Sequence, residues 1–344
     1  MSRTLLTLGT IGLLFLAGHL LTTNAPRAPM WLGVPNNPGT IVRQDFPVTV
    51  TDGYGHPIRI DRPPQRIVSL MLATDEILLE LVDHKRITAL TPIATTPSVS
   101  NCVAEAKGFP TVVGTSLERI ISLRPDIVLA ARFTEIPTVS TLKQAGITTF
   151  RFGRYETLAD IRHNIKLLGV ITDERERASE ILHWMSDSLG VVAAAGSRAA
   201  AKPRVLLYRG GFSAGAATLF DEMLTAAGGT NVAVEAGLVG HGPISKELAI
   251  ALDPEVIVMT NPYAEGDDPP IDPRSSVIDD PSWQGVTAVR HRRVHLVPAP
   301  ELGCISHHIV RGALALGRVI HPTLFENVEI PAFPSQSSQQ GDSE

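Results

Sequence analysis

The chain has 344 residues, of which 44 % are hydrophobic and 19 % are charged. This composition supports a buried core and excludes a wholly disordered chain, and the length suggests two domains of ordinary size. The formal net charge is −5 and aromatic residues make up only 5 %, which argues against a nucleic-acid partner. The two cysteines, Cys102 and Cys304, are too few for a disulfide scaffold, and we expect two reduced thiols.

The N-terminus has the pattern of a secretory signal peptide. Arg3 precedes an apolar run over residues 5–21, which small residues and prolines follow. We expect residues 1–25 to be the signal peptide and residues 26–45, rich in Pro, Asn and Gly, to be a linker. An uncleaved N-terminal anchor is the alternative. The pattern therefore predicts export from the cytoplasm.

Residues 48–60 alternate in polarity on both sides of Asp52-Gly53. Alternation around an Asp-Gly pair predicts a β-hairpin. A short apolar run at residues 67–70 then predicts a buried strand. At the other end, residues 331–344 are polar and low in complexity, so we expect a disordered tail.

An internal repeat is the most informative feature. Residues 118–130 predict a helix, a Pro-acid turn and a buried strand, and residues 247–259 repeat this pattern position by position. Upstream of each copy, a strand leads to an Asp-Glu pair, at Asp75-Glu76 and at Asp221-Glu222. Alternating strands and helices favour a parallel sheet covered by helices. The repeat therefore predicts two similar α/β lobes, over residues 46–155 and 202–330.

Residues 156–201 show almost no strand signal, and we expect a helical connector there. Apolar residues at helical spacing continue from Ala178 to Val192. They predict a helix of about 25 residues, near 38 Å long, within residues 173–199. Such a helix would join the lobes stiffly. A helix packed wholly on one sheet is the alternative.

Several motifs occur in the order typical of one family. They are Pro64-Gln-Arg-Ile-Val-Ser-Leu with Thr74-Asp-Glu-Ile-Leu, Val113-Gly-Thr-Ser-Leu-Glu-Arg-Ile, Leu123-Arg-Pro-Asp-Ile-Val, Ala227-Gly-Gly-Thr-Asn, Ile244-Ser-Lys-Glu-Leu and Leu252-Asp-Pro-Glu-Val-Ile-Val. From about Phe46 to Pro322 the chain resembles the helical-backbone (class III) periplasmic substrate-binding proteins of ABC importers. The resemblance implies an α/β fold with two similar lobes, one long connecting α-helix and a ligand cleft between the lobes.

The resemblance also implies a function. Such proteins capture iron–siderophore, haem or cobalamin in the periplasm and deliver it to an ABC permease. We expect a metal chelate as the ligand, an iron–siderophore or haem first and a corrinoid second. We expect no enzymatic activity, no cofactor and a monomer.

Two turns depart from the family pattern. The turn after the first strand reads Met71-Leu-Ala-Thr-Asp in place of the usual Ser-Pro-rich turn, and His307-His308 replace the usual Pro-Arg pair before the last helix. Both turns face the cleft in the family. The usual ligand therefore does not transfer directly to this chain.

Glu118 and Glu247 occupy equivalent positions in the repeat, each near the start of a helix. In the family, glutamates at these places dock onto arginines of the permease, and two carboxylates on a rigid body fix the register of a partner. The alternative is that each glutamate only complements its helix dipole.

The cleft candidates lie in loops at strand ends, where open α/β sheets bind ligands. They are Arg132, Phe133, Tyr208, Arg209, His241, Glu301, His307 and His308. Guanidinium groups bind carboxylates in a bidentate manner, so Arg132 and Arg209 favour an anionic ligand. The histidines and Glu301 also leave open a receptor for a free metal ion, although no tight ligand spacing is present.

Residues 211–215 match G-x-S-x-G, the nucleophile-elbow pattern of serine hydrolases. Ser213 would be the nucleophile of a secreted hydrolase, with Asp267 or Asp268 and His295 or His307 as its partners. The repeat and the family resemblance explain this loop without catalysis, so the hydrolase stays an alternative.

Overall fold

The structure, a computed structural model, describes residues 37–114, 116–263 and 271–334. The predicted signal peptide, most of the predicted linker, Asp267, Asp268 and residues 335–344 lie outside these ranges. Within them, no helix combines the length and the apolar character that crossing a membrane requires.

A small antiparallel sheet precedes the first lobe. Its strands are β1 (Thr40–Arg43), β2 (Val48–Thr51) and β3 (Pro57–Ile60). The predicted hairpin is confirmed, and Asp52 Oδ1 holds its turn by accepting hydrogen bonds from the backbone N–H groups of Tyr54 and His56, each at 2.9 Å. β1 lies within residues 26–45, which were predicted to be a linker. Its residues Thr40 and Ile41 pair with β2. Part of the predicted linker is therefore a strand.

The first lobe is built on a parallel sheet of four strands in the order β5-β4-β6-β7. Apolar strand residues such as Ile67 and Val128 are fully buried, as expected for a sheet with helices on its faces. The elements are β4 (Ile67–Ser69), α3 (Leu72–Leu81), η1 (His84–Arg86), β5 (Ile87–Ala89), η2 (Pro92–Thr95), α4 (Val103–Ala106), α5 (Leu117–Ser122), β6 (Ile127–Ala130), α6 (Ile136–Gln144) and β7 (Thr148–Arg151).

The second lobe repeats this order, because its parallel sheet runs β10-β8-β12-β13. In both sheets the first strand lies second, beside an edge strand that follows it in the chain. The elements are β8 (Arg204–Leu207), β9 (Phe212–Ala214), α9 (Leu219–Ala226), β10 (Thr230–Asn231), α10 (Val232–Glu235), β11 (His241–Pro243), α11 (Lys246–Ala251), β12 (Val256–Asn261), α12 (Ser275–Ile278), η3 (Pro281–Trp283), α13 (Thr287–Arg290), β13 (Val294–Pro298), α14 (Ala299–Leu302), α15 (Ile309–Ile320) and α16 (Pro322–Phe325). The internal repeat predicted from the sequence is therefore a repeat of topology.

Two helices connect the sheets, α7 (Leu158–Thr172) and α8 (Arg175–Gly196). The side chain of Thr157 caps α7 in a capping box with Asp160, and Asp173 ends it in the left-handed conformation (φ 66°). A Cβ at Gly169 would lie 2.6 Å from the Cβ of Ala178, so glycine permits the close packing of α7 on α8. The predicted long helix is confirmed over 22 residues.

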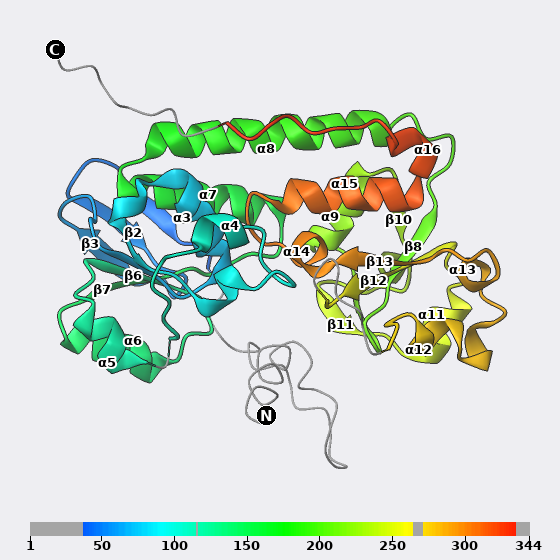
Figure 1. The fold of residues 1–344 in the computed structure, drawn as a ribbon, viewed down its shortest axis with the longest axis horizontal. Helices are drawn as coiled ribbons and strands as arrows, with labels where there is room; N and C mark the ends of the chain where they lie inside the picture. Colours follow the sequence, from blue (N-terminus) through cyan, green and yellow to red (C-terminus); the bar gives the residue numbers. More distant parts are fainter. Residues whose placement is uncertain (1–36, 115, 264–270, 335–344) are drawn as a thin grey trace, which may run out of the picture. The chain divides into compact units, whose positions relative to one another are not determined.

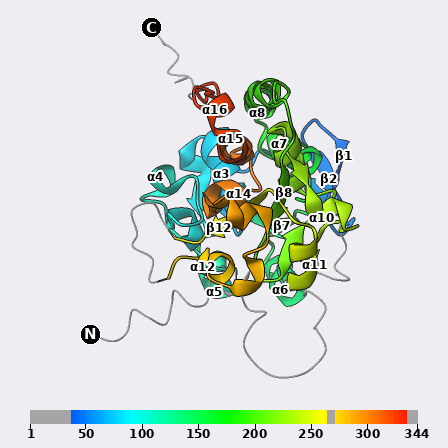
Figure 2. The same ribbon diagram turned by 90° about the vertical axis from the view of Figure 1, so that its right-hand side faces the viewer.

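α8 packs against α3 and α7 on one side and against α9, α15 and α16 on the other. Both views show α8 and α15 on the same side of the two sheets (Figure 1; Figure 2). Buried side chains of α8, among them Ile181 and Met185, belong to one apolar core that includes residues of both sheets. The fold is thus α/β, with two similar lobes and a long helix that packs against both.

Residues 326–334, here called the C-terminal arm, run along α8 (Figure 1). The indole Nε1 of Trp184 donates a hydrogen bond to the Pro331 carbonyl at 2.9 Å, and the ring of Phe333 lies 4.6 Å from that of Trp184. The prediction of a disordered tail from residue 331 is therefore wrong for residues 331–334. One aromatic side chain that finds an apolar surface is enough to order this short segment.

Candidate functional site

The carboxyl ends of β6 and β7 place two charged side chains together. Arg132 follows β6 and Glu156 follows β7, and the Arg132 Nη1 lies 2.9 Å from the Glu156 Oε1. The phenol of Tyr54, in the hairpin turn, donates a hydrogen bond to the Arg132 carbonyl at 2.9 Å. The guanidinium of Arg151 lies 3.6 Å from the centre of the Tyr54 ring. Arg132 is therefore held at both its backbone and its side chain.

The loop after β8 and the start of β11 bring Arg209 and His241 from the second lobe. Burial and the charge of Arg209 lower the pKa of His241, while the charge of Glu156 raises it. Glu156 of the first lobe thus acts electrostatically on His241 of the second. Burial also lowers the pKa of Arg209, and its Nε is buried with no hydrogen-bond partner in the described ranges. Through its pair with Arg132, Glu156 thus links the end of β6 electrostatically to His241, and a shared role of Arg132, Arg209 and His241 in ligand binding stays a prediction.

Glu156 was not among the predicted site residues. Its only sequence signal is its position, a few residues beyond a strand and directly before the Thr157 helix cap. It matters because it neutralises part of the positive charge that the arginines bring.

A small apolar cluster lies between residues of the two lobes. It contains Met71, Ala73 and Ala131 of the first lobe, packed with Tyr155 and with Ile305 of the second. The Tyr155 hydroxyl is buried without a hydrogen-bond partner in the part of the chain that the structure describes, and burial raises its pKa well above the usual value. The Met71 turn, which departs from the family pattern, therefore supplies an apolar surface here.

Other predicted site residues are placed differently. Tyr208 is 7 % exposed and packs edge-on against Trp283 in the core of the second lobe, whereas Phe133 is 60 % exposed. Glu301 is partly buried on α14. Their roles in ligand binding stay predictions.

His307 and His308 are enclosed. The ring of His307 lies 6.0 Å from that of Trp184 and 5.1 Å from that of Phe333, and its centre is 4.0 Å from that of His308. Burial lowers the pKa of His307 to about 3 and that of His308 well below the usual value, so both rings are neutral at pH 7. A contact between either ring and a ligand stays a prediction, and it requires this packing to open.

Two glutamates make contacts distant in sequence, and they are the second members of the two repeated Asp-Glu pairs: Glu76 is buried and Glu222 is partly buried. Glu76 accepts a hydrogen bond from the Asn101 N–H at 2.8 Å and another from the Ser306 hydroxyl of the second lobe. Glu222 of the second lobe accepts a hydrogen bond from the Leu158 N–H, at the start of α7, at 2.5 Å. Here these contacts are called the two latches.

The alternatives of a serine hydrolase and a free-metal receptor find little support in the described residues. Ser213 lies within β9 and not on a strand-to-helix turn, and its buried hydroxyl has no hydrogen-bond partner among the described residues. The elbow geometry predicted by G-x-S-x-G is therefore not formed. In the described ranges no three His, Cys, Asp or Glu side chains gather as a metal site. Cys102 and Cys304 are both free and buried.

The predicted docking residues, Glu118 on α5 and Glu247 on α11, are exposed, and each is the second residue of its helix. The equivalence inferred from the repeat thus holds for their local structure. Their contact with a permease is not tested by the fold.

A family model described as "Periplasmic binding protein" matches residues 67–301. The chain belongs to this family. A cobalamin-binding protein of Halobacterium salinarum is 30 % identical over 217 residues, which cover 62 % of this chain and 58 % of that relative. An uncharacterised ABC transporter substrate-binding lipoprotein of Bacillus subtilis, YvrC, is 23 % identical over 290 residues, or 82 % of this chain and 88 % of the relative.

Solved structures share the fold. A periplasmic haem-binding protein from Pseudomonas aeruginosa superposes with a TM-score of 0.61 at 24 % identity, covering 79 % of this chain and 96 % of that one. At this identity the likeness establishes the two-lobed fold and leaves the ligand open.

Proposed function

We propose that this chain is the solute receptor of an ABC importer, and that it binds a metal chelate between its lobes and delivers it to the permease. The observation that carries the proposal is the Arg132–Glu156 ion pair, whose glutamate acts electrostatically on His241 of the other lobe, as Arg209 also does. Membership of the periplasmic binding protein family supports it. No bond is made or broken in this function.

The ligand we propose is a metal chelate with anionic groups. Two arginines against one glutamate leave a net positive charge, which favours carboxylate or other anionic groups. The exposed ring of Phe133 suits the hydrophobic part of a macrocycle. The cobalamin-binding and haem-binding relatives support a tetrapyrrole-derived ligand, and an iron–siderophore remains within the proposed class.

Titration of the purified chain with hemin, cyanocobalamin and a ferric hydroxamate, followed by absorbance and intrinsic fluorescence, tests this proposal. We expect one of the three to bind at or below micromolar concentration, since a preformed site loses little free energy to ordering. Free Fe³⁺ and Zn²⁺ form the comparison arm. Binding of a free ion with none of the chelates, or hydrolysis of a generic ester that Ser213→Ala abolishes, would refute it.

Docking through Glu118 and Glu247 is part of the proposed function. Glu118→Arg combined with Glu247→Arg should abolish stimulation of the importer's ATPase, because two charge-assisted contacts become repulsive. Ligand affinity should stay within a few-fold of wild type. Loss of ligand binding in this double variant would place the two glutamates in the cleft and not on the docking surface.

Export completes the proposal. The periplasmic family supports a secreted receptor, and residues 1–25 are the proposed signal peptide. N-terminal sequencing of the protein from the periplasmic fraction of its host tests this. A mature chain that retains residues 5–21 would instead indicate an anchor.

A further inference from the structure

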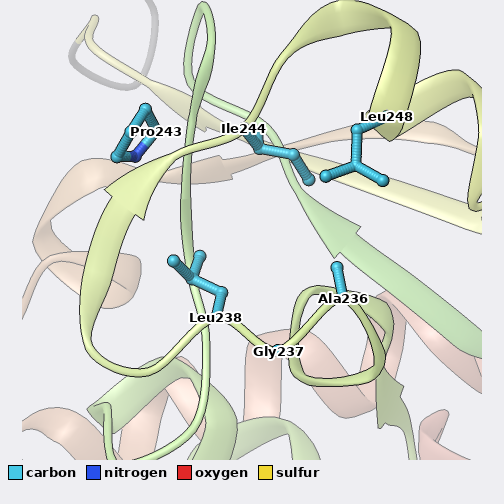
Figure 3. Close-up of a pocket in the computed structure, with 6 residues that line it drawn as sticks. All are labelled: Ala236, Gly237, Leu238, Pro243, Ile244 and Leu248. Carbon is cyan, nitrogen blue, oxygen red and sulfur yellow. The ribbon is translucent and has the colours of Figure 1, made fainter.

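A small pocket, lined by apolar side chains and by backbone, lies beside the proposed docking residue Glu247. The end of α10, the strand β11 and the helix α11 surround it, and its volume is about 150 Å³ (Figure 3). Its lining residues are Ala236, Gly237, Leu238, Pro243, Ile244 and Leu248. None of these side chains carries a polar group. Here it is called the Glu247 pocket.

The chain segments that line this pocket, and their neighbours in sequence, carry several exposed apolar residues. Leu248 is 42 % exposed, Val234 39 % and Val239 72 %. Phe212, which is 48 % exposed, pairs directly across the β9–β11 ribbon with the lining residue Pro243. Clustered exposed apolar side chains commonly mark an interaction surface, whereas isolated ones need no explanation.

An uncompensated carboxylate borders the pocket. Glu247 directly precedes Leu248, and no salt bridge to it is present in the described part of the chain. The neighbouring Lys246 amine lies 3.0 Å from Asp280, so its charge is already paired. Hydrogen bonds from its own backbone and from the Ser245 hydroxyl lower the pKa of Glu247. The negative charge of Glu247 therefore lies next to the Glu247 pocket.

We propose that the Glu247 pocket receives an apolar side chain of the permease, adjacent to the basic residue that pairs with Glu247. This inference rests on the proposed function and names a second anchor for the same docking surface. In other proteins, apolar cavities of about 150 Å³ hold a benzene ring, so one leucine or phenylalanine side chain fits the space. A side chain that fills a pocket beside a charged pair is a typical hot spot of a protein interface.

Three single variants test this. Leu248→Ser removes an exposed apolar wall of the pocket, and Ala236→Trp fills its mouth while adding apolar surface. Val42→Ser, on β1, is the matched control because Val42 is an exposed apolar residue (66 %) that does not line the pocket. The affinity of each variant is measured for the host importer that the wild-type chain stimulates, reconstituted in lipid nanodiscs. Ligand titration and melting temperature confirm the fold.

We expect Leu248→Ser and Ala236→Trp each to weaken importer binding by about tenfold, the usual effect of losing one hot spot. Val42→Ser should bind like wild type, and all three should bind ligand normally. If the double glutamate variant loses importer binding while Ala236→Trp and Leu248→Ser keep it, the pocket proposal is wrong and the proposed function stands. If the wild-type chain stimulates no importer of its host, both proposals fail.

Discussion

The guanidinium of Arg209 has an unsatisfied hydrogen-bond donor within the described residues. Its Nε is buried with no partner among the described residues, and burial lowers its pKa. A buried N–H group without an acceptor costs free energy in the unliganded state, and a ligand that supplies an anionic acceptor recovers it.

Arg209→Ala should therefore weaken chelate binding at least tenfold, because a charge-assisted hydrogen bond contributes about 1.5–3 kcal/mol. The melting temperature should stay the same or rise, since no described hydrogen bond of the Nε is lost. The exposed Arg43→Ala is the control. Calorimetric titration measures the first effect and thermal unfolding the second. Unchanged affinity in Arg209→Ala would contradict the proposal that the ligand is anionic.

Asp75, the first member of the Asp75-Glu76 pair, is fully buried and accepts hydrogen bonds from Thr91. Burial raises its pKa from 3.8 to about 7. The folded chain therefore keeps this proton to a higher pH than the unfolded chain does. The associated stability is complete below about pH 4 and is lost as pH rises towards 7.

The Asp75→Asn side chain does not titrate. As pH rises from 4 to 7, the free energy of unfolding of wild type should therefore fall relative to that of the variant. The difference should grow by up to about 1.4 kcal/mol per pH unit. Urea unfolding at pH 5, 6 and 7.5 measures it, with the exposed Asp45→Asn as control. A constant difference across this range would contradict the burial argument.

The C-terminal arm stabilises α8 although it has no regular secondary structure. A chain that ends at Ile330 loses the Phe333 packing and leaves the Trp184 Nε1 without its acceptor. Its free energy of unfolding should fall by about 2–4 kcal/mol, from the loss of the partly buried Phe333 ring and of the hydrogen bonds that Trp184 and Arg177 donate to the arm.

The matched control is a chain that ends at Pro334, which keeps every described contact of the arm and should unfold like wild type. Trp184 fluorescence should shift to the red only in the shorter chain, because its ring becomes exposed. Identical spectra and melting temperatures for both truncations would show that the arm does not stabilise the fold.

Patterns local in sequence predicted most of the elements. The repeat indicated both sheets, and the spacing from Ala178 to Val192 indicated α8, because a buried helical face recurs at a fixed period. The latches, Glu156 and the arm could not be predicted in this way. Each depends on a contact between residues distant in sequence, for which neither periodicity nor composition carries a signal. His307 shows the same limit, since only the packed fold reveals that it is enclosed.

Across the described part of the molecule, α8, the two latches and the apolar cluster at Met71 are among the features that hold the lobes in place. An α-helix of 22 residues is about 33 Å long and resists bending. One latch ties the buried Glu76 of the first lobe to Ser306 of the second, and the other ties Glu222 of the second lobe to the start of α7. These features predict that ligand binding changes the separation of the lobes only slightly.

Spin labels on Lys143→Cys in the first lobe and Arg290→Cys in the second can measure this separation, since both positions are exposed. Burial raises the pKa of Cys102 to about 12 and that of Cys304 well above its usual value, so the native thiols should not take the label. The distance distribution should move by less than its own width when chelate is added. A larger shift would show that the latches open.

The strand β11 has a further consequence for transport. It begins at His241, beside Arg209, and only Ile244 and Ser245 separate its end from the helix that carries Glu247. Among the described residues it pairs with β9 in a two-stranded ribbon that is separate from the four-stranded sheet. If both proposed roles hold, cargo that displaces His241 also displaces the docking surface. Empty receptors would then dissociate from the permease faster than loaded ones. Unloaded copies would therefore compete only weakly with loaded copies for the permease.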